Sequence, residues 1–285
     1  MEFHVKASAC ARCGKCVATC PLGMVELPAE GPVRLKPNEC LVCGHCLAVC
    51  PEGAISADGA AAQPVPEHEV GLEELGRFLR SRRSVRVYEN RPVPRELLEE
   101  VLEAARYAPS AANTRSLHFT VVSDPERLRR TVGTIMDYSV RRSALLRRSA
   151  LARFLVRLVR SPMSQGLRPK VARAARVAVE SWERGGPGFF HNAPLLVIIH
   201  TDAEAILPRD DACYTAYEVA LAAHAAGLGC CIIGFGPPLL QNLPQVRRDL
   251  GIPDEHEVQV VLTLGYAAER FPHLPPREAR PVAWV

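Results

Sequence analysis

The stretch CARCGKCVATCP runs from Cys10 to Pro21, and CLVCGHCLAVCP repeats its pattern from Cys40 to Pro51. In each copy, two residues separate neighbouring members of the first three cysteines, three residues precede the fourth, and a proline follows. Eleven cysteines in a chain of 285 residues could suggest a disulfide scaffold. Two runs of four cysteines with one shared spacing instead predict that these thiols bind a metal cofactor.

The doubled motif is typical of bacterial ferredoxins that hold two [4Fe–4S] clusters. Two-residue gaps let three thiolates converge on one cluster from a tight loop, and the fourth cysteine of each run binds the other cluster. The alternatives are a zinc site, which usually takes two pairs of cysteines, and disulfides, which a cytosolic chain disfavours. Residues 1–57 therefore resemble a ferredoxin-like two-cluster domain. We expect one cluster on Cys10, Cys13, Cys16 and Cys50 and the other on Cys40, Cys43, Cys46 and Cys20.

The composition is that of a globular protein, with 48% apolar and 23% charged residues. It excludes a disordered, collagen-like or coiled-coil chain. No run of 18 apolar residues exists, and the N-terminal residues have no apolar segment typical of a secretory signal, so we expect a cytoplasmic protein. A net charge of +4 is too small to indicate nucleic acid. Cys213, Cys230 and Cys231 lack any partner spacing and are expected to be small buried residues.

A second domain is expected over residues 71–285, after a linker at 58–70 that is rich in small residues and proline. Its pattern predicts helices and strands in mixed order. We expect helices from residue 72 onward, at 94–108 and at 210–227, and strands at 117–122, 193–200, 230–235 and 256–266. Helices on both sides of a central mixed sheet give an α+β sandwich.

Four segments of this domain stand out by residue type. They are Arg82-Arg83-Ser84-Val85-Arg86, Ala108-Pro109-Ser110-Ala111-Ala112-Asn113, the glycine-rich run GLGCCIIG at 227–234, and Pro275–Pro281 with its two arginines. Each is weakly specific: a solvated basic turn, a helix-ending asparagine or a buried strand would explain the first three. In this order and spacing they resemble the FMN-dependent nitroreductase family over residues 75–285. The whole chain resembles a nitroreductase fused to a ferredoxin.

This resemblance implies FMN as a cofactor of the second domain. A guanidinium group binds phosphate through a planar fork, so the arginines are expected at the FMN phosphate, with the Ser84 hydroxyl beside them. The residues assigned in this way are Arg82, Arg83, Ser84, Arg86, Arg277 and Arg280.

The flavin ring is expected to contact two other segments. The resemblance places Pro109, Ser110 and Asn113 at its polar edge, and a backbone amide near Ile233 or Gly234 at flavin N5. The family often has Ser-Ser where this chain has Ser110-Ala111, which changes what lies beside the ring. No catalytic residue is singled out by the sequence.

A basic insert is expected at about 138–186, where the family varies most. Residues 138–184 hold 12 Lys and Arg against two Glu, and residues 151–160 are amphipathic. The favoured interpretation is a helical hairpin with a solvated arginine face. Docking of an acidic electron-donor protein and association with an anionic membrane are alternatives, although membrane association is not expected for the protein as a whole.

Together these features predict an iron–sulfur flavoprotein oxidoreductase. Electrons would pass from the [4Fe–4S] clusters to FMN and on to a small organic acceptor such as a nitroaromatic, a quinone or an activated alkene. The expected donor is a ferredoxin or NAD(P)H, and the expected assembly is a homodimer, as in the family. The alternatives are an electron-transfer protein that serves a partner enzyme, with no substrate of its own, and a flavin-degrading or cofactor-synthesis enzyme.

Overall fold

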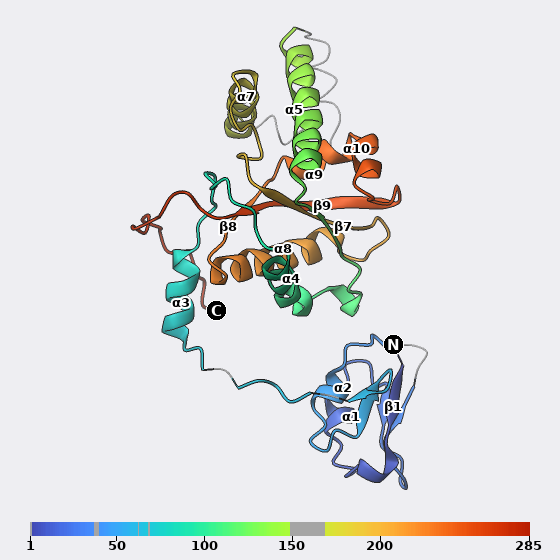
Figure 1. The fold of residues 1–285 in the computed structure, drawn as a ribbon. Coiled ribbons are helices and arrows are strands. Elements are labelled where there is room, and N and C mark those ends of the chain that lie inside the picture. The colour runs from blue at the N-terminus through green and yellow to red at the C-terminus, as the bar shows by residue number, and fades with distance from the viewer. Residues whose placement is uncertain (1, 37–39, 62, 68, 149–168) are drawn as a thin grey trace. The chain divides into compact units, whose positions relative to one another are not determined.

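A computed structural model describes residues 2–36, 40–61, 63–67, 69–148 and 169–285 of the chain (Figure 1). The chain forms two compact units. Unit 1 comprises Met1–Val70 together with Ser110–Arg115, and unit 2 comprises Gly71–Pro109 with Ser116–Val285. The residues 151–160 that the sequence predicts as an amphipathic helix lie outside the described residues.

Unit 1 contains two similar short helices, each of which follows a cysteine loop. Its elements are β1 (Phe3–Val5), η1 (Ala7–Ala9), α1 (Lys15–Thr19), β2 (Val25–Glu26), β3 (Arg34–Leu35), α2 (His45–Ala48), β4 (Ile55–Ala57) and β5 (Ala60–Ala61). Gly14 and Gly44 precede the helices with φ of 75° and 76°, a left-handed conformation that glycine adopts without a Cβ clash. Helices α1 and α2 contact each other, and a small core forms around Cys16, Cys46 and Ile55.

The segment expected to be linker begins as a hairpin. Strand β4 pairs with β5 in antiparallel register, Ala57 opposite Ala60. Asp58 and Gly59 connect them with φ of 47° and 80°, as a two-residue type I′ turn requires. Asp-Gly between short strands is a hairpin signal that the composition-based linker prediction overlooked.

Unit 2 is built on a four-stranded sheet of order β6-β7-β9-β8. The strands are β6 (His118–Val122), β7 (Leu195–Asp202), β8 (Gly229–Ile232) and β9 (His256–Gly265). All three pairings are antiparallel, and the single parallel pairing among the described residues is an isolated bridge between Ser84 and Cys230. The expected mixed sheet is therefore antiparallel in its named strands. The physical reason is that β9, the last strand in the chain, inserts between β7 and β8, which run parallel to each other but do not touch.

Helices cover both faces of this sheet (Figure 1). The helices of unit 2 are α3 (Leu72–Ser81), which buries none of its residues, α4 (Arg95–Ala104), α5 (Pro125–Arg148), α7 (Pro169–Glu183), α8 (Pro208–Ala225), α9 (Gly236–Gln241) and α10 (Pro244–Asp249), with the 3₁₀ turn η2 (Ala105–Tyr107). A further 3₁₀ turn, η3 (Ala111–Asn113), belongs to unit 1. Helices α4 and α8 enclose one core with one face of the sheet, and α5, α7, α9 and α10 enclose the other. Because both faces are covered, β7 is buried from Leu195 to Thr201, which explains its continuous apolar run.

Candidate functional site

The first cysteine motif lines a small hollow that is partly open to solvent. Its lining includes Cys10, Cys13 and Cys16 from the first motif and Cys50 from the second. Burial raises the pKa of the Cys16 thiol, and the nearby Cys50 and Cys13 raise it further, so these sulfur atoms lie close together. The hollow is therefore lined by all four cysteines that we expect to bind the first cluster, three from the first motif and one from the second.

The three closely spaced cysteines of the second motif, Cys40, Cys43 and Cys46, also lie near one another. Burial raises the pKa of Cys46, and Cys40 and Cys43 add to the shift. Backbone amides approach the thiols: Met24 donates to Cys20 Sγ at 3.2 Å and Ala54 donates to Cys50 Sγ at 3.3 Å. Such donors stabilise thiolates, the form that binds iron.

No group of His, Cys, Asp or Glu in the described part of the chain is arranged around a single metal ion.

The Ser110–Arg115 segment, expected at the flavin ring, belongs to unit 1. Asn113 donates through Nδ2 to the carbonyl oxygen of Val42 at 2.8 Å, within the Cys40–Cys43 loop. Ser110 Oγ accepts from the amide of Arg115 at 3.1 Å, and Pro109 is exposed. In this structure the Asn113 side chain therefore binds the cluster loop.

The Arg82–Arg86 segment runs beside β8. Ser84 pairs with Cys230 in the parallel bridge, and Val85 donates its amide to Cys230 O at 3.0 Å. Val85 is buried and fixes the segment, which leaves the flanking polar side chains at the edge of the sheet. Arg83 turns back on the chain and donates to the carbonyl oxygens of Arg80 and Arg82 at 2.6 and 2.7 Å.

Arg82 presents an unsatisfied donor. Its Nε is buried and has no hydrogen-bond partner among the described residues, an uncommon state for a guanidinium nitrogen. Its Cζ lies 5.9 Å from the ring centre of Tyr217 on α8. A half-buried cation whose Nε is buried and lacks a partner among the described residues fits an anionic ligand such as a phosphate.

The positive charge of this segment affects three neighbouring groups. Burial lowers the pKa of His224, and Arg82 and Arg83 lower it further. Burial raises the pKa of Cys231, an effect that Arg86 opposes. Burial lowers the pKa of His191, and Arg86 adds to the shift. The segment is therefore a cationic site lined by neutral groups.

Of the two amides expected at the flavin, that of Ile233 is engaged. It donates to Val261 O at 2.8 Å, and the side chain is buried. At Gly234 the relevant feature is the space beside the backbone. A Cβ added there would meet no atom within 4 Å among the described residues. Space next to the backbone at Gly234 fits the close approach of a flat ligand.

Arg277 and Arg280 are not brought to this site within one chain. Both are exposed, in a C-terminal segment without helix or strand. Neither forms a hydrogen bond or ion pair with the described residues.

Three residues near the site were missed by the sequence analysis. Tyr217 and His224 are seven positions apart and share one face of α8, so helical periodicity could have grouped them. His191 has φ of 58° and follows two buried phenylalanines; no local sequence signal places it beside Arg86. The expectation of burial holds for Cys230 and Cys231 and is wrong for Cys213, which is exposed on α8.

Comparison with known families identifies the two parts. Residues 79–266 match the model of the Nitroreductase family, and residues 3–51 match that of the 4Fe-4S dicluster domain. The first match covers more than half of the chain, so the chain belongs to the nitroreductase family and carries an N-terminal dicluster domain.

Individual relatives agree with this assignment. An NADH dehydrogenase/NAD(P)H nitroreductase, so described, of Methanothermobacter thermautotrophicus is 27% identical over 67% of this chain and 76% of its own length. The nitrobenzene nitroreductase of Ectopseudomonas oleovorans is 27% identical over 68% of this chain and 87% of its own. An FMN-bound nitroreductase from Bacteroides fragilis shares the fold at 21% identity, with a TM-score of 0.53 over 74% of this chain and 97% of its own.

These findings confirm the predicted class, an oxidoreductase of the nitroreductase family with a domain for two [4Fe–4S] clusters. The sequence predicts FMN in addition to the clusters, and FMN is the cofactor bound in the Bacteroides fragilis nitroreductase. In the ranges that the structure covers, none of the helices combines the length and apolar character needed to cross a membrane.

Proposed function

We propose that this protein passes electrons from its two [4Fe–4S] clusters to FMN and from there to a small organic acceptor. Bound FMN would link carriers of single electrons to an acceptor that takes a pair. The observation that carries the proposal is the joining, in one chain, of a four-cysteine hollow and a cationic site with an unsatisfied Arg82 donor. We expect eight irons and one FMN per chain.

The residues of unit 2 fit the roles expected at FMN. Arg82 and Arg86 would hold the phosphate, with Ser84 between them on the segment that Val85 anchors to β8. Gly234 would let the backbone lie against the ring. His191, half-buried beside Arg86, stays neutral near pH 7 because burial and the adjacent cation both disfavour its protonation.

We also propose a homodimer, supported by unpartnered apolar surface. Helix α3 buries none of its residues, and its Leu72 is 87% exposed. The C-terminal segment exposes Trp284 to 92%. A second copy would cover these groups and could receive Arg277 and Arg280 at its flavin site. Light scattering of the purified protein measures the assembly directly.

A reducing compartment such as the cytoplasm suits this chemistry, because all eight motif cysteines must remain reduced thiolates. Acceptors of the nitroaromatic, quinone or activated-alkene classes remain the candidates. A ferredoxin or NAD(P)H remains the candidate donor.

Flavin reduction in the full-length protein tests the electron route. Cys13→Ser combined with Cys43→Ser disables both clusters, and Cys213→Ser is a matched control outside the motifs. Stopped-flow absorbance should show FMN reduction by a reduced ferredoxin in the wild type and the control, and loss of it in the double variant. Dithionite should still reduce FMN in all three. Equal rates with ferredoxin in all three would show that the clusters do not supply the flavin.

The full chain is the correct material for this test. Removal of residues 1–60 would take away Val42, to which Asn113 donates, and would disturb the Ser110–Arg115 segment together with the clusters.

A further inference from the structure

Helices α5 and α7 belong to a segment with a large excess of positive charge. From the start of α5 to the end of α7, residues 125–183 contain 14 Lys and Arg and four acidic residues, Glu126, Asp137, Glu180 and Glu183. The Asp137 carboxylate already accepts a hydrogen bond from Trp182 Nε1 at 3.4 Å. The segment therefore carries a surplus of cations that its own carboxylates cannot neutralise.

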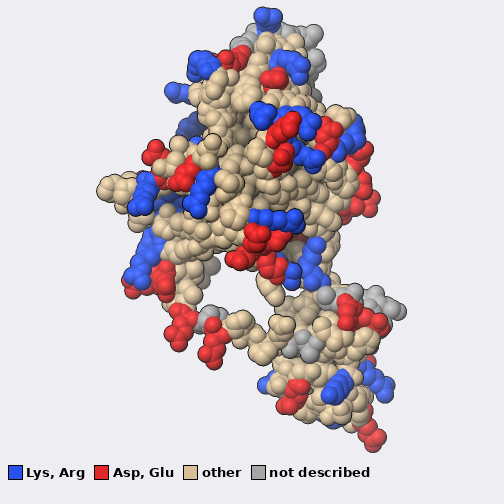
Figure 2. Space-filling view, in the orientation of Figure 1, with Lys and Arg blue, Asp and Glu red and all other residues tan. Residues whose placement is uncertain are grey.

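Eight of these cations lie exposed on the described helices, and three of them, Arg127, Arg129 and Arg130, lie near the start of α5. The other five are Arg141 and Arg148 of α5 and Lys170, Arg173 and Arg176 of α7, which we call the α5–α7 basic surface. None of them forms an ion pair with any residue that the structure describes. The intervening residues 149–168 contain no Asp or Glu, so they add no compensating charge. Figure 2 shows Lys and Arg side chains over the outer ends of both helices, with few acidic ones among them.

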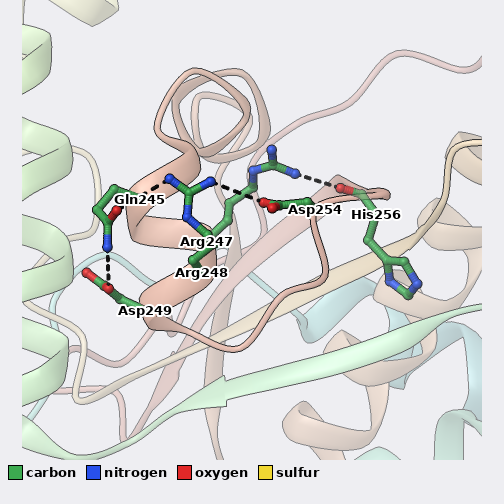
Figure 3. A network of polar contacts seen from close by, with 6 residues as sticks. All are labelled: Gln245, Arg247, Arg248, Asp249, Asp254 and His256. Atoms are coloured by element: carbon green, nitrogen blue, oxygen red, sulfur yellow. Dashed lines mark hydrogen bonds and ion pairs between the residues drawn. The ribbon is translucent and has the colours of Figure 1, made fainter.

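Several arginines on other helices of unit 2 do form ion pairs. Arg77 pairs with Glu73 on α3, and Arg95 pairs with Glu99 on α4. On α10, Arg248 approaches Asp254 at 3.4 Å and Gln245 bonds to Asp249, as Figure 3 shows. Unpaired like charges repel one another, so their concentration on α5 and α7 is a cost to the isolated protein.

The helices that carry the α5–α7 basic surface pack, through other residues, in the core next to the candidate flavin site. Ile135 of α5 and Val179 of α7 pack in the same core as Phe189 and Ile233. Ile233 directly precedes Gly234, the residue with open space for the ring. The two helices therefore connect the α5–α7 basic surface with the core that contains Ile233.

We propose that the α5–α7 basic surface docks an acidic protein that donates single electrons. The inference rests on the proposed function, which requires an external donor. Each encounter oxidises the donor by one electron and reduces this protein by one, so two encounters supply the pair that the acceptor takes. Carboxylates on the partner would neutralise the exposed cations and speed association.

An anionic membrane fits the described surface less well. Binding to a bilayer surface needs an apolar face beside the basic one. Among the described residues, only Leu145 and Val177 are large apolar side chains exposed on these two helices.

Charge reversal in the full-length, cofactor-loaded protein tests the proposal. The variant is Arg141→Glu with Arg173→Glu and Arg176→Glu. The control, Arg77→Glu with Arg95→Glu and Arg106→Glu, makes the same change in net charge at arginines that are paired with glutamates. The probe is a purified acidic two-cluster ferredoxin, and binding is measured by calorimetry. We expect the variant to bind at least about tenfold more weakly at about 50 mM salt and the difference to vanish near 500 mM.

Three outcomes overturn the proposal: equal binding by variant and wild type, equal weakening in the control, and binding to phosphatidylglycerol vesicles without binding to the ferredoxin. If the glutamate variant misfolds, the three glutamine substitutions replace it and should give a smaller loss in the same direction. Reduction by methyl viologen, a small cation that needs no docking surface, should be unchanged. If methyl viologen does not reduce the wild-type protein, the proposed function itself is wrong.

Discussion

Gly229→Ala should loosen the flavin site through a single packing contact. A Cβ at this position would lie 2.7 Å from Cγ2 of Val85 and 2.8 Å from its Cβ and Cγ1. Unstrained carbon contacts are about 3.5–4.0 Å, so Val85 must move by roughly 1 Å. Overpacking of this kind costs about 1–3 kcal/mol. Because Val85 lies between Ser84 and Arg86, we expect FMN affinity to fall by about tenfold, equivalent to about 1.4 kcal/mol.

Two measurements on the full-length protein check this prediction. Urea unfolding followed by circular dichroism reports stability, and FMN fluorescence titration reports affinity. Adding Val85→Ala removes two of the three close contacts, those to Cγ1 and Cγ2, so the double variant should be more stable than the sum of the single changes by about 1 kcal/mol. Gly133→Ala in α5 is the matched control: its Cβ meets nothing within 4 Å, and it should stabilise by about 0.5–1 kcal/mol with unchanged FMN affinity. Wild-type stability and affinity in Gly229→Ala would refute the packing argument.

Three further predictions concern the cofactors and pH. Cys50→Ser should remove the cluster of the first motif and leave about four irons per chain; a loss confined to the second-motif cluster in electron paramagnetic resonance would exclude the crossed ligation. Arg82→Ala should weaken FMN binding by about one to two decades in a fluorescence titration, because it deletes a charge-assisted contact worth about 1.5–3 kcal/mol, whereas Arg77→Ala should leave affinity unchanged. Burial, then the neighbouring His256 and His118, lower the pKa of His200 to about 4. Since the unfolded chain takes up this proton near pH 6.5, stability should be fully present above that pH and decline as pH falls toward 4, by at most about 3 kcal/mol; a flat urea-midpoint profile over this range, or the same decline in His200→Gln, would contradict it.

The cluster domain was predictable because its information is local. Cysteines separated by two residues must share one loop whatever the rest of the chain does, so the spacing alone indicates the cofactor. The helix and strand pattern of unit 2 was equally accessible. The helix expected at 94–108 forms as α4 and buries Leu98 and Val101, and the apolar run of β7 is a buried strand.

The arrangement of those elements was decided by tertiary structure. No local pattern states that β9 enters between β7 and β8, so the sheet is antiparallel where a mixed sheet was expected. The hydrogen-bond partners of Asn113 and Ile233 also depend on contacts between distant segments. Asn113 donates through its side chain to the carbonyl oxygen of Val42, and Ile233 donates its backbone amide to the carbonyl oxygen of Val261.

The cationic site shows the same division. The sequence singles out Arg82, Ser84 and Arg86 by type, because guanidinium and hydroxyl groups suit a phosphate. The packing of Val85 against Gly229 and its bond to Cys230 fix the segment only in the folded chain, where the Nε of Arg82 is buried without a hydrogen-bond partner among the described residues. The physical reason is that residue chemistry is fixed by the sequence at each position, whereas burial and the loss of hydrogen-bond partners arise from contacts between distant segments.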